Sequence, residues 1–275
     1  MKNVFLKVLL FWVSCIMAFP VFAQRSHSFS AGTGTIYYYG DLTDRFNNSL
    51  LRPALCLSYS KYLLPTVSFR TSFSYGEVGA TDAMAVDDAR QVRNLHFRSP
   101  IYEVSGMLVY EFVNDKNFGN SWIGVPHFSP LVFAGVGMFH FNPQARYDGE
   151  WYDLQPLGTE GQYIPGNTPG PYSLWQIAVP FGGGISLRMS EYMGMNLELG
   201  YRVTLTDYLD DISTVYPDYA ALGEVSGPVA VALSERSADG RFQPGEIRGH
   251  SNANDGYFFT TISVTYYLSR FATRN

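Results

Sequence analysis

The chain has 275 residues, enough for one barrel or for one or two soluble domains. Aromatic residues make up 16% of the chain and charged residues another 16%, whereas soluble domains average about 25% charged residues. A mean hydropathy of −0.05 excludes a bundle of transmembrane helices, and a formal net charge of −5 argues against nucleic acid as a partner.

Residues 1–23 have the pattern of a secretory signal peptide. Lys2 and Lys7 form a positive segment, an uncharged apolar run covers residues 8–22, and small residues stand at Val21 and Ala23, before the expected cleavage point. A retained membrane anchor is an alternative, but the apolar run is short for a membrane span and a proline interrupts its end. The sequence therefore predicts export and a mature domain at 24–275.

A lipoprotein signal at Cys15 is another alternative, but Trp12 stands where such a signal has a small aliphatic residue. Because residues 1–23 contain two lysines and no acid, the mature chain keeps 17 of 19 basic and all 24 acidic residues, a formal charge of −7 (17 minus 24). Cys56 is then the remaining cysteine. It can form no intramolecular disulfide or thiolate metal site, so we expect a small buried strand residue.

Eight segments are predicted as β-strands; five alternate strictly between apolar and polar residues, 27–39 and 51–62 alternate with small residues, and both faces of 129–141 are largely apolar. One face carries large apolar side chains, as at Met195, Leu197 and Leu199, and the other carries polar or charged ones, as at Glu198 and Arg202. This pattern is typical of strands that have lipid on one side and a polar lumen on the other. The segments are 27–39, 51–62, 67–75, 101–112, 129–141, 175–187, 195–206 and 258–268.

We therefore predict an all-β fold: a closed antiparallel transmembrane β-barrel of about eight strands in the outer membrane. A transmembrane helix is the alternative for segment 129–141, because residues 117–145 contain no Asp, Glu, Lys or Arg. As a helix, its uninterrupted part would span only ~21 Å of a ~30 Å hydrocarbon core. We expect a strand in which Gly135 and Gly137 mark a tight bend or close packing.

An even number of strands places both chain ends in the periplasm, so the connections alternate between the two sides. We expect extracellular loops at 40–50, 80–97, 143–172 and 208–255, and periplasmic connections at 63–65, 114–127 and 189–193. The connection at 114–127 is long for its side and is the best candidate for a periplasmic contact. The role of the loop at 208–255 stays open.

Six charged residues fall on the inward face of the predicted strands. Because isolated charges in a narrow lumen are costly, we predict a paired network that joins Arg70 or Arg202 to Glu103 or Glu198. The alternative is a charged, conducting pore. The six residues are Arg70, Glu103, Glu111, Arg188, Glu198 and Arg202.

Candidate catalytic and metal-binding residues are few. His140 lies near the extracellular end of its strand, where a lipid A-modifying barrel would place a catalytic histidine; a rim histidine hydrogen-bonded to a neighbour is the simpler interpretation. Acidic residues cluster in two loops, without the spacing of a known calcium loop, and we expect them to be solvated. They are Asp82, Asp87 and Asp88, and Asp207, Asp210 and Asp211.

The sequence contains no HExxH, GxSxG, phosphate loop or CxxC. We therefore expect no enzyme activity, no catalytic residue, no metal ligand and no cofactor. Segment 154–162 has Pro and Gly at fixed offsets and Glu160 as its one charge, so we expect it to fold over the barrel mouth. Whether it plugs the lumen or meets a partner stays open. Trp175, which follows it, is expected in the interfacial aromatic belt.

Several segments resemble the PorG family, the outer-membrane barrel component of the type IX secretion system of Bacteroidetes. The loop motifs are specific, whereas the strand glycines alone would be weak, and the resemblance extends over about 30–216 and the last strand. The matching segments are 39–42 (YGDL), 99–103 (SPIYE), 141–145 (FNPQA), 154–162 (LQPLGTEGQ), 180–184 (PFGGG), 198–202 (ELGYR) and 206–213 (TDYLDDIS).

The resemblance implies a structural component of the protein secretion apparatus, which anchors or positions the periplasmic ring built by the lipoprotein PorK and its partner PorN. It implies no catalytic residue and no small-molecule substrate. Two other classes stay open: a stand-alone surface barrel that works as an adhesin, and an enzyme that modifies lipid A.

Overall fold

The computed structural model describes residues 27–43, 45–113, 127–168, 170–190, 192–250 and 253–268. The expected signal peptide at 1–23 and the connection at 114–126 lie outside these ranges. Within them, no helix combines the length and apolarity needed to cross a membrane.

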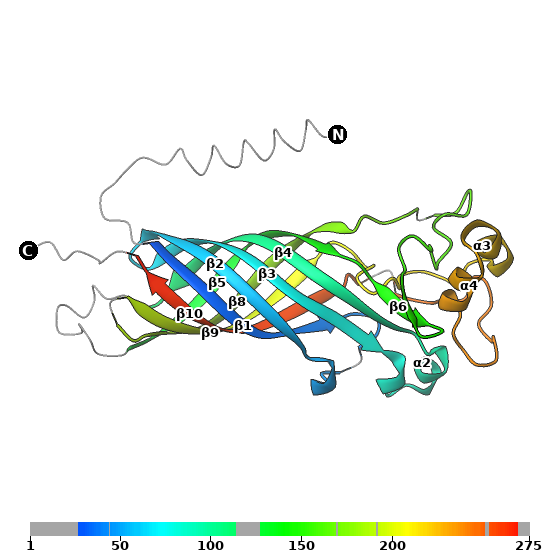
Figure 1. Cartoon of the computed structure of the whole chain (residues 1–275), viewed down its shortest axis with the longest axis horizontal. Coiled ribbons are helices and arrows are strands. Elements are labelled where there is room, and N and C mark those ends of the chain that lie inside the picture. Colours follow the sequence, from blue (N-terminus) through cyan, green and yellow to red (C-terminus); the bar gives the residue numbers. More distant parts are fainter. Residues whose placement is uncertain are drawn as a thin grey trace, which may run out of the picture.

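Eight long antiparallel strands close into a barrel, as predicted (Figure 1). Each strand pairs with its neighbour along the chain, β1 pairs with β10, and β3 pairs with β4, so the wall has no free edge. Segment 129–141 is a strand, β5. The eight strands are β1 (His27–Tyr39), β2 (Arg52–Leu64), β3 (Val67–Thr81), β4 (His96–Glu111), β5 (His127–Phe141), β8 (Trp175–Arg188), β9 (Met193–Thr204) and β10 (Gly256–Tyr267).

Of the two roles predicted for the glycines of β5, a tight bend or close packing, Gly135 has the second. A Cβ at Gly135 would lie 2.1 Å from the carbonyl oxygen of Gly106 and 2.7 Å from Cα of Met107, both in the neighbouring strand β4. A side chain there would collide with backbone, which cannot move aside without breaking the ladder. The strand therefore needs glycine where the two backbones approach most closely.

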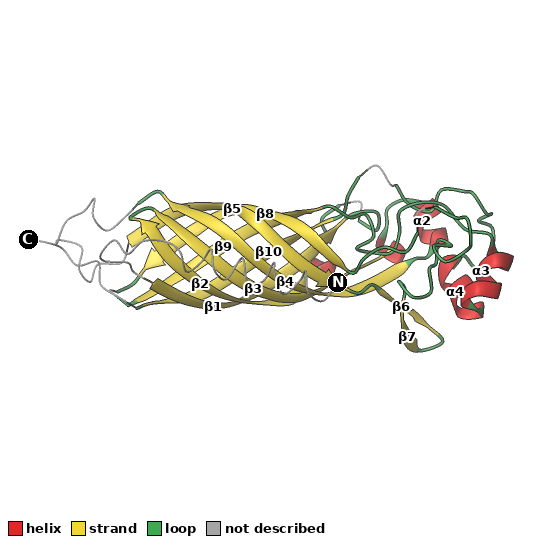
Figure 2. Cartoon of the chain, turned by 90° about the horizontal axis from the view of Figure 1, so that it is seen from above, coloured by secondary structure: helices red, strands yellow, loops and turns green. Residues whose placement is uncertain are grey.

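The remaining elements gather at one end of the barrel, where they form a cap (Figure 2). They come from the four loops that were predicted to lie outside the cell, and outer-membrane barrels place their longer loops there. We therefore assign the cap to the extracellular side. The elements are η1 (Asn48–Leu50), η2 (Asp82–Met84), α2 (Asp88–Arg93), β6 (Gln144–Tyr147), β7 (Glu150–Asp153), α3 (Tyr219–Ser226) and α4 (Pro228–Ser234).

A short hairpin, β6–β7, lies inside the predicted loop at 143–172. Its two-residue turn is Asp148-Gly149, with φ angles of +48° and +87°. Positive φ at both central positions defines the tight turn that Asp-Gly pairs favour. The sequence therefore carried a signal for this hairpin that the strand assignment missed.

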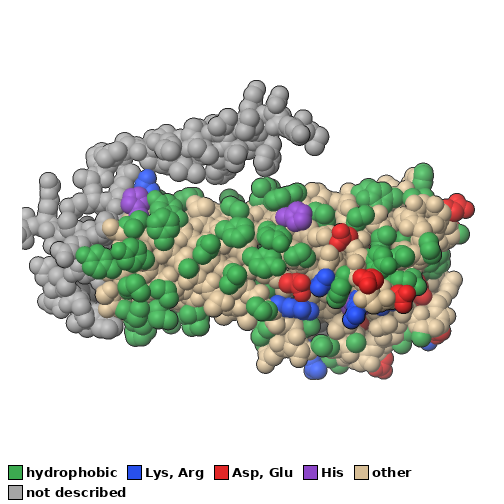
Figure 3. Space-filling view, viewed as in Figure 1, with side chains coloured by type: hydrophobic (Ala, Val, Ile, Leu, Met, Phe, Trp, Pro, Cys, Tyr) green, Lys and Arg blue, Asp and Glu red, His purple; other side chains and the backbone are tan. Residues whose placement is uncertain are grey.

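The outer surface of the barrel wall is apolar. In β4 the outward side chains Tyr102, Val104, Leu108 and Tyr110 are all exposed, while inward Glu103 is fully buried. Figure 3 shows hydrophobic side chains along the wall and charged ones concentrated at the cap. Side chains of this kind on a closed sheet face lipid, so the protein is an outer-membrane barrel.

A row of aromatic rings, the aromatic belt, crosses four neighbouring strands toward the extracellular end of the apolar band. Tyr75, Tyr102, His140 and Trp175 occupy consecutive cross-strand positions on β3, β4, β5 and β8. Their ring centroids lie 4.9 Å, 6.4 Å and 5.0 Å apart in that order. Trp175 therefore belongs to the interfacial belt, as predicted from its position.

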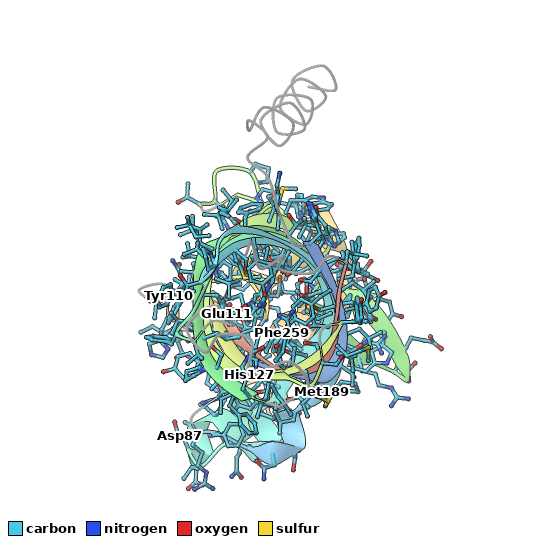
Figure 4. The ribbon with its side chains drawn as sticks, turned by 90° about the vertical axis from the view of Figure 1, so that its left-hand side faces the viewer. Asp87, Tyr110, Glu111, His127, Met189 and Phe259 are labelled. Carbon is cyan, nitrogen blue, oxygen red and sulfur yellow. The ribbon has the colours of Figure 1, made fainter. Side chains whose placement is uncertain are left out.

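The lumen changes character along its length. Buried serines line the periplasmic half, including Ser28, Ser60, Ser68 and Ser129. The extracellular half is filled by an apolar core from the strand ends and the loop that follows β9. Its most deeply buried members include Ile36, Tyr38, Ile101, Phe139, Phe141, Leu209, Tyr257 and Phe259. In Figure 4, Phe259 lies inside the barrel, and neighbouring Tyr110 and Glu111 point to opposite sides of the wall. Side chains of the barrel itself thus occupy its interior.

Candidate functional site

Two ion pairs cross the middle of the lumen. Arg70 Nη1 lies 2.7 Å from Glu198 Oε2, and Arg202 Nε lies 3.2 Å from Glu103 Oε2. Each pair joins strands from different parts of the chain, β3 with β9 and β9 with β4. The predicted network is confirmed: both arginines pair with one of the two expected glutamates.

Further contacts surround the second ion pair. The hydroxyl of Tyr257 donates to Glu103 Oε2 at 2.9 Å, and Arg202 Nη1 donates to the carbonyl of Gly200 at 3.0 Å. The guanidinium of Arg202 also lies 4.6 Å from the ring centre of Phe259. A buried ion pair contributes to stability only when its remaining donors and acceptors are used. These contacts use Glu103 Oε2 and Arg202 Nη1, whereas Glu103 Oε1 is buried and accepts no hydrogen bond from the described residues.

The other two predicted inward charges lie near the periplasmic end. Glu111 accepts a hydrogen bond from the hydroxyl of Tyr62 at 2.8 Å. Arg188 places its guanidinium 3.6 Å from the ring centre of Tyr267. Cys56 also faces inward, where the hydroxyl of Ser74 lies 3.6 Å from its sulfur. The lumen therefore holds these charges in specific contacts with the wall.

The segments 154–162 and 206–213 meet in the cap through Glu160. This buried carboxylate accepts hydrogen bonds from the backbone N–H groups of Ser213 (2.9 Å) and Thr214 (3.1 Å) and from the Thr214 hydroxyl (2.7 Å). Arg248 Nη1 adds an ion pair at 3.0 Å. One side chain thus joins two loops and a third segment that precedes β10.

Asp211 makes the second connection between the same segments. Its carboxylate accepts from the hydroxyls of Thr159 and Tyr172, both at 2.5 Å, and its carbonyl accepts from Arg248 Nη1 at 2.6 Å. Burial raises the pKa of Asp211 to about 6, although the charge of Arg248 opposes this shift. The φ of +67° at Asp211 lies in the left-handed region, which aspartate tolerates better than most residues.

Arg93 ties the second extracellular loop to this cluster. Its guanidinium forms an ion pair with Asp82 at 2.8 Å and donates to the carbonyl of Arg248 at 2.6 Å. Arg90 pairs with the same aspartate at 3.2 Å. The 80–97 loop and the 208–255 loop are therefore held together by buried polar contacts.

The prediction that the loop aspartates are solvated is wrong for Asp207, which exposes 8% of its surface, and for Asp82, Asp210 and Asp211, which expose 0%, 1% and 0%. The partners of Asp82, Asp210 and Asp211 are arginines, hydroxyls and backbone N–H groups, several of them distant in the sequence, which no local spacing reveals. Asp87 and Asp88 are exposed as expected, and Asp87 caps the start of α2. In the part of the chain that the structure describes, no group of three His, Cys, Asp or Glu side chains is arranged to hold a metal ion.

Segment 154–162 folds over the barrel mouth, as predicted. Leu154 packs with Ala145 of β6 and Leu233 of α4 in a small apolar cluster. The 208–255 loop supplies two α-helices of the cap, α3 and α4, and an isolated bridge between Val215 and Ile247. The cap is therefore a folded unit built mainly from the third and fourth loops.

His140 lies on the lipid-facing side of β5. Its ring contacts Trp175 and Tyr102 in the aromatic belt, at 5.0 Å and 6.4 Å between ring centroids. These ring contacts, rather than the predicted hydrogen bond, position the histidine. Sequence reasoning also missed Arg93, Arg248, Tyr38 and Asp255, which lie in segments without periodicity or at a strand end.

Comparisons with solved structures find other small outer-membrane barrels. Ail of Yersinia pestis, solved with a heparin analogue, has a TM-score of 0.43 and 11% identity, with 89% of this chain and 99% of that chain covered. OprG of Pseudomonas aeruginosa has a TM-score of 0.40 and 9% identity, with 88% and 95% covered. The N-terminal barrel of OprF from the same organism has a TM-score of 0.37 and 12% identity, with 89% and 97% covered.

These likenesses concern the fold alone. No curated protein matches the chain. The family described as a domain of unknown function, DUF6089, matches residues 6–224, which is well over half of the sequence. The chain, an outer-membrane β-barrel, belongs to the DUF6089 family.

Proposed function

We propose that this chain is a structural outer-membrane subunit of the type IX secretion apparatus, which anchors or positions the periplasmic ring of PorK and PorN. The observation that carries the proposal is the meeting of 154–162 and 206–213, two of the loop segments that carry the resemblance, through Glu160 and Asp211. Segments that resemble one family and interlock in one cap support a shared architecture with that family.

The filled lumen fits an anchoring role better than a conducting one. An apolar core occupies the extracellular half of the barrel, and paired charges cross its middle. An eight-stranded barrel is just wide enough for its own side chains. The cargo would therefore pass beside this subunit, and its part would be to hold the ring against the membrane.

The β4–β5 connection is the proposed ring contact, because its sequence is long for the periplasmic side. The test replaces residues 114–126 with a two-residue Asn-Gly turn in a tagged copy of the protein. We expect the variant to fold in the membrane but to lose co-purification of PorK. An epitope inserted between Asp148 and Gly149, at the exposed tip of β6–β7, is the matched control and should leave the ring intact.

Gene deletion tests the function as a whole. Export of cargo that bears a C-terminal sorting domain should stop, and the ring should become unstable. Complementation with the epitope-tagged control should restore both. Normal export in the deletion strain would refute the proposal.

The proposal includes no catalytic step, no cofactor and no small-molecule substrate. His140 is the residue that an enzymatic role would use, and it is placed among the rings of the aromatic belt. We expect identical lipid A mass spectra in strains with and without the protein. A difference that disappears in a His140→Gln strain would favour the enzyme class instead.

A stand-alone adhesin is the second candidate, and the β6–β7 hairpin favours it. Tyr147 and Trp151 are exposed on this hairpin, and exposed aromatic residues are common in binding surfaces. Replacing both with serine would reduce binding to host or matrix if the barrel is an adhesin. Under the secretion proposal, the same variant exports cargo normally and binds host or matrix as well as the starting protein does.

A further inference from the structure

Three buried oxygen-bearing side chains meet where β1 enters the cap. The Tyr38 hydroxyl lies 2.5 Å from Asp210 Oδ2 and 2.9 Å from Asp255 Oδ1. The three residues expose 0%, 1% and 1% of their surface. The second oxygen of each carboxyl group is also used, because Asp210 Oδ1 accepts from Ile212 N at 3.0 Å and Asp255 Oδ2 accepts from Leu209 N at 2.9 Å.

A count of hydrogens shows that two ionised carboxylates do not fit this geometry. Two short oxygen–oxygen contacts need two hydrogens, and a tyrosine hydroxyl supplies one. When Tyr38 donates to one carboxylate, the other contact needs a carboxyl O–H that donates to the tyrosine oxygen. Without that hydrogen, lone pairs would face each other at 2.9 Å or less.

We propose that Asp210 and Asp255 share one proton across Tyr38 and that this proton latches the extracellular cap to the barrel wall. Tyr38 belongs to the wall strand β1, whereas Asp210 and Asp255 lie near the two ends of the 205–255 segment. One protonated triad therefore closes both ends of the longest loop at once. Its loss removes this contact between the loop and the wall and leaves the loop held by its other contacts, such as the Arg248–Glu160 pair.

The charges around the triad favour a proton. Among the described residues, no Arg or Lys forms an ion pair with Asp207, Asp210 or Asp255. Arg248 pairs with Glu160, and Arg93, which faces Asp210 at longer range, pairs with Asp82. Two more acids face the triad: Asp41, on the turn after β1, and Asp207, which exposes 8%.

Both triad carboxyls accordingly bind protons more tightly than usual. Burial, and then the neighbouring carboxylates, raises the pKa of Asp210 and of Asp255 well above the ordinary value. Closure of the cap is thus favoured at low pH and is lost as the pH rises from about 4 through the raised pKa. The latch opens on the alkaline side.

The test measures hydrogen exchange of peptides from 205–255 in the full-length protein in nanodiscs, between pH 5 and 9, corrected for intrinsic exchange. An Asp207→Asn background removes the titration of that neighbour. We expect protection of the 205–255 peptides to fall by up to about tenfold per pH unit, the limit for one proton. Adding Asp255→Asn should abolish this fall, because its amide can donate to Tyr38 and accept from Leu209 as the protonated carboxyl does.

Two controls isolate the triad. His250→Gln removes the histidine that lies 3.6 Å from Asp41, and it should leave the slope unchanged. Heat-modified gel mobility reports whether the barrel of each variant is folded. Equal slopes with and without Asp255→Asn would overturn the proposal. So would calcium binding that abolishes the slope in the Asp207→Asn protein, because a cation would then balance these charges.

Infrared spectroscopy of the starting protein gives a result that does not depend on a variant folding. Above the pKa of about 7 of Asp207, where that neighbour is ionised, a band from a buried protonated carboxyl group should still be present and should shift in heavy water. Tyr38→Phe should move the band and reduce cap protection at every pH. Absence of a protonated carboxyl band above that pKa would refute the shared proton directly.

Discussion

Arg248 and Glu160 form a buried ion pair, with 3.0 Å between Nη1 and Oε1, where the third and fourth extracellular loops meet. The pair is nearly inaccessible to solvent, with 2% and 1% of the two side chains exposed. The same Nη1 also reaches the carbonyl of Asp211 at 2.6 Å. One arginine side chain thus joins the two loop segments of the cap, 154–162 and 206–213.

Arg248→Met should open the cap while the barrel stays folded. Removing one partner of a buried pair leaves an uncompensated charge, at a cost of about 3–5 kcal/mol. Limited proteolysis in nanodiscs should cut the 154–168 and 208–250 segments much faster than in the starting protein. Arg241→Met is the control, because its pair with Asp239 is exposed and should not matter. Equal cleavage rates for the two variants would contradict this role for Arg248.

Exchanging the charges of Arg70 and Glu198 should show whether the stability of the barrel depends on pairing opposite charges or on which residue carries which charge. Arg70→Glu brings two carboxylates together in the lumen and should destabilise the barrel by about 3–5 kcal/mol. Glu198→Arg in the same chain should recover much of this loss. Urea unfolding in lipid vesicles measures both effects. The Arg52–Glu77 pair is more exposed, at 43% and 31% of the side chains, so its exchange should change stability by about 1 kcal/mol or less.

The barrel should not conduct ions steadily in planar bilayers. The path would have to cross the apolar core around Ile36, Phe139 and Tyr257 and the two ion pairs below it. Phe139→Ala and Phe259→Ala together should raise the frequency of brief openings without producing a stable pore. Long, uniform conductance steps from the starting protein would show that the charged-pore alternative is correct.

All eight strands of the wall could be predicted from the sequence, most of them because lipid and lumen impose opposite demands on successive side chains, and 129–141 because it is too short for a membrane-spanning helix. The inward charges and their pairing followed from the same period. Outside the membrane this constraint ends: β3 continues to Thr81 and β4 begins at His96, beyond the predicted 67–75 and 101–112. The β3–β4 hairpin continues beyond the apolar band through backbone pairing alone. Its outward residues in this extension include Glu77 and Arg98, so the apolar alternation that predicts a membrane strand is missing.

The cap could not be predicted in the same way. Tyr38 and Asp255 are 217 positions apart, and Arg93 reaches a carbonyl 155 positions away. Such contacts follow from loop closure and leave no periodic trace. The acidic loops were expected to be solvated because an aspartate near a turn usually is, but the buried partners of Asp210 and Asp211 include residues distant in the sequence. The Asp-Gly pair at 148–149 was a local signal that a search for turns would have found.

Val136→Arg tests the assignment of the lipid-facing side. Val136 points outward from the middle of β5, opposite Gly106, about midway along the apolar band. Arginine at the bilayer midplane of a barrel costs about 2–4 kcal/mol. Equilibrium folding into vesicles should show that loss, whereas Val225→Arg in the exposed part of α3 should fold normally. Equal stability of the two variants would mean that this face does not contact lipid.

Asp207→Asn should make the cap more stable above neutral pH. Both oxygens of this carboxyl are buried and accept no well-formed hydrogen bond from the described residues. Burial raises the pKa of Asp207 from 3.8 to about 7, with Ser213 opposing the shift and Asp41 and Glu160 adding to it.

The folded cap therefore binds this proton more tightly than the open loop does. The contribution of Asp207 to stability is present below about pH 4, declines as the pH rises, and is lost above about pH 7. Hydrogen exchange of the peptides that follow β9 should show this decline in the starting protein and a shallower one in Asp207→Asn. Asp148→Asn, at the exposed hairpin turn, should match the starting protein at every pH. If the Asp207→Asn and Asp148→Asn curves run parallel, Asp207 is ionised in the folded cap without cost.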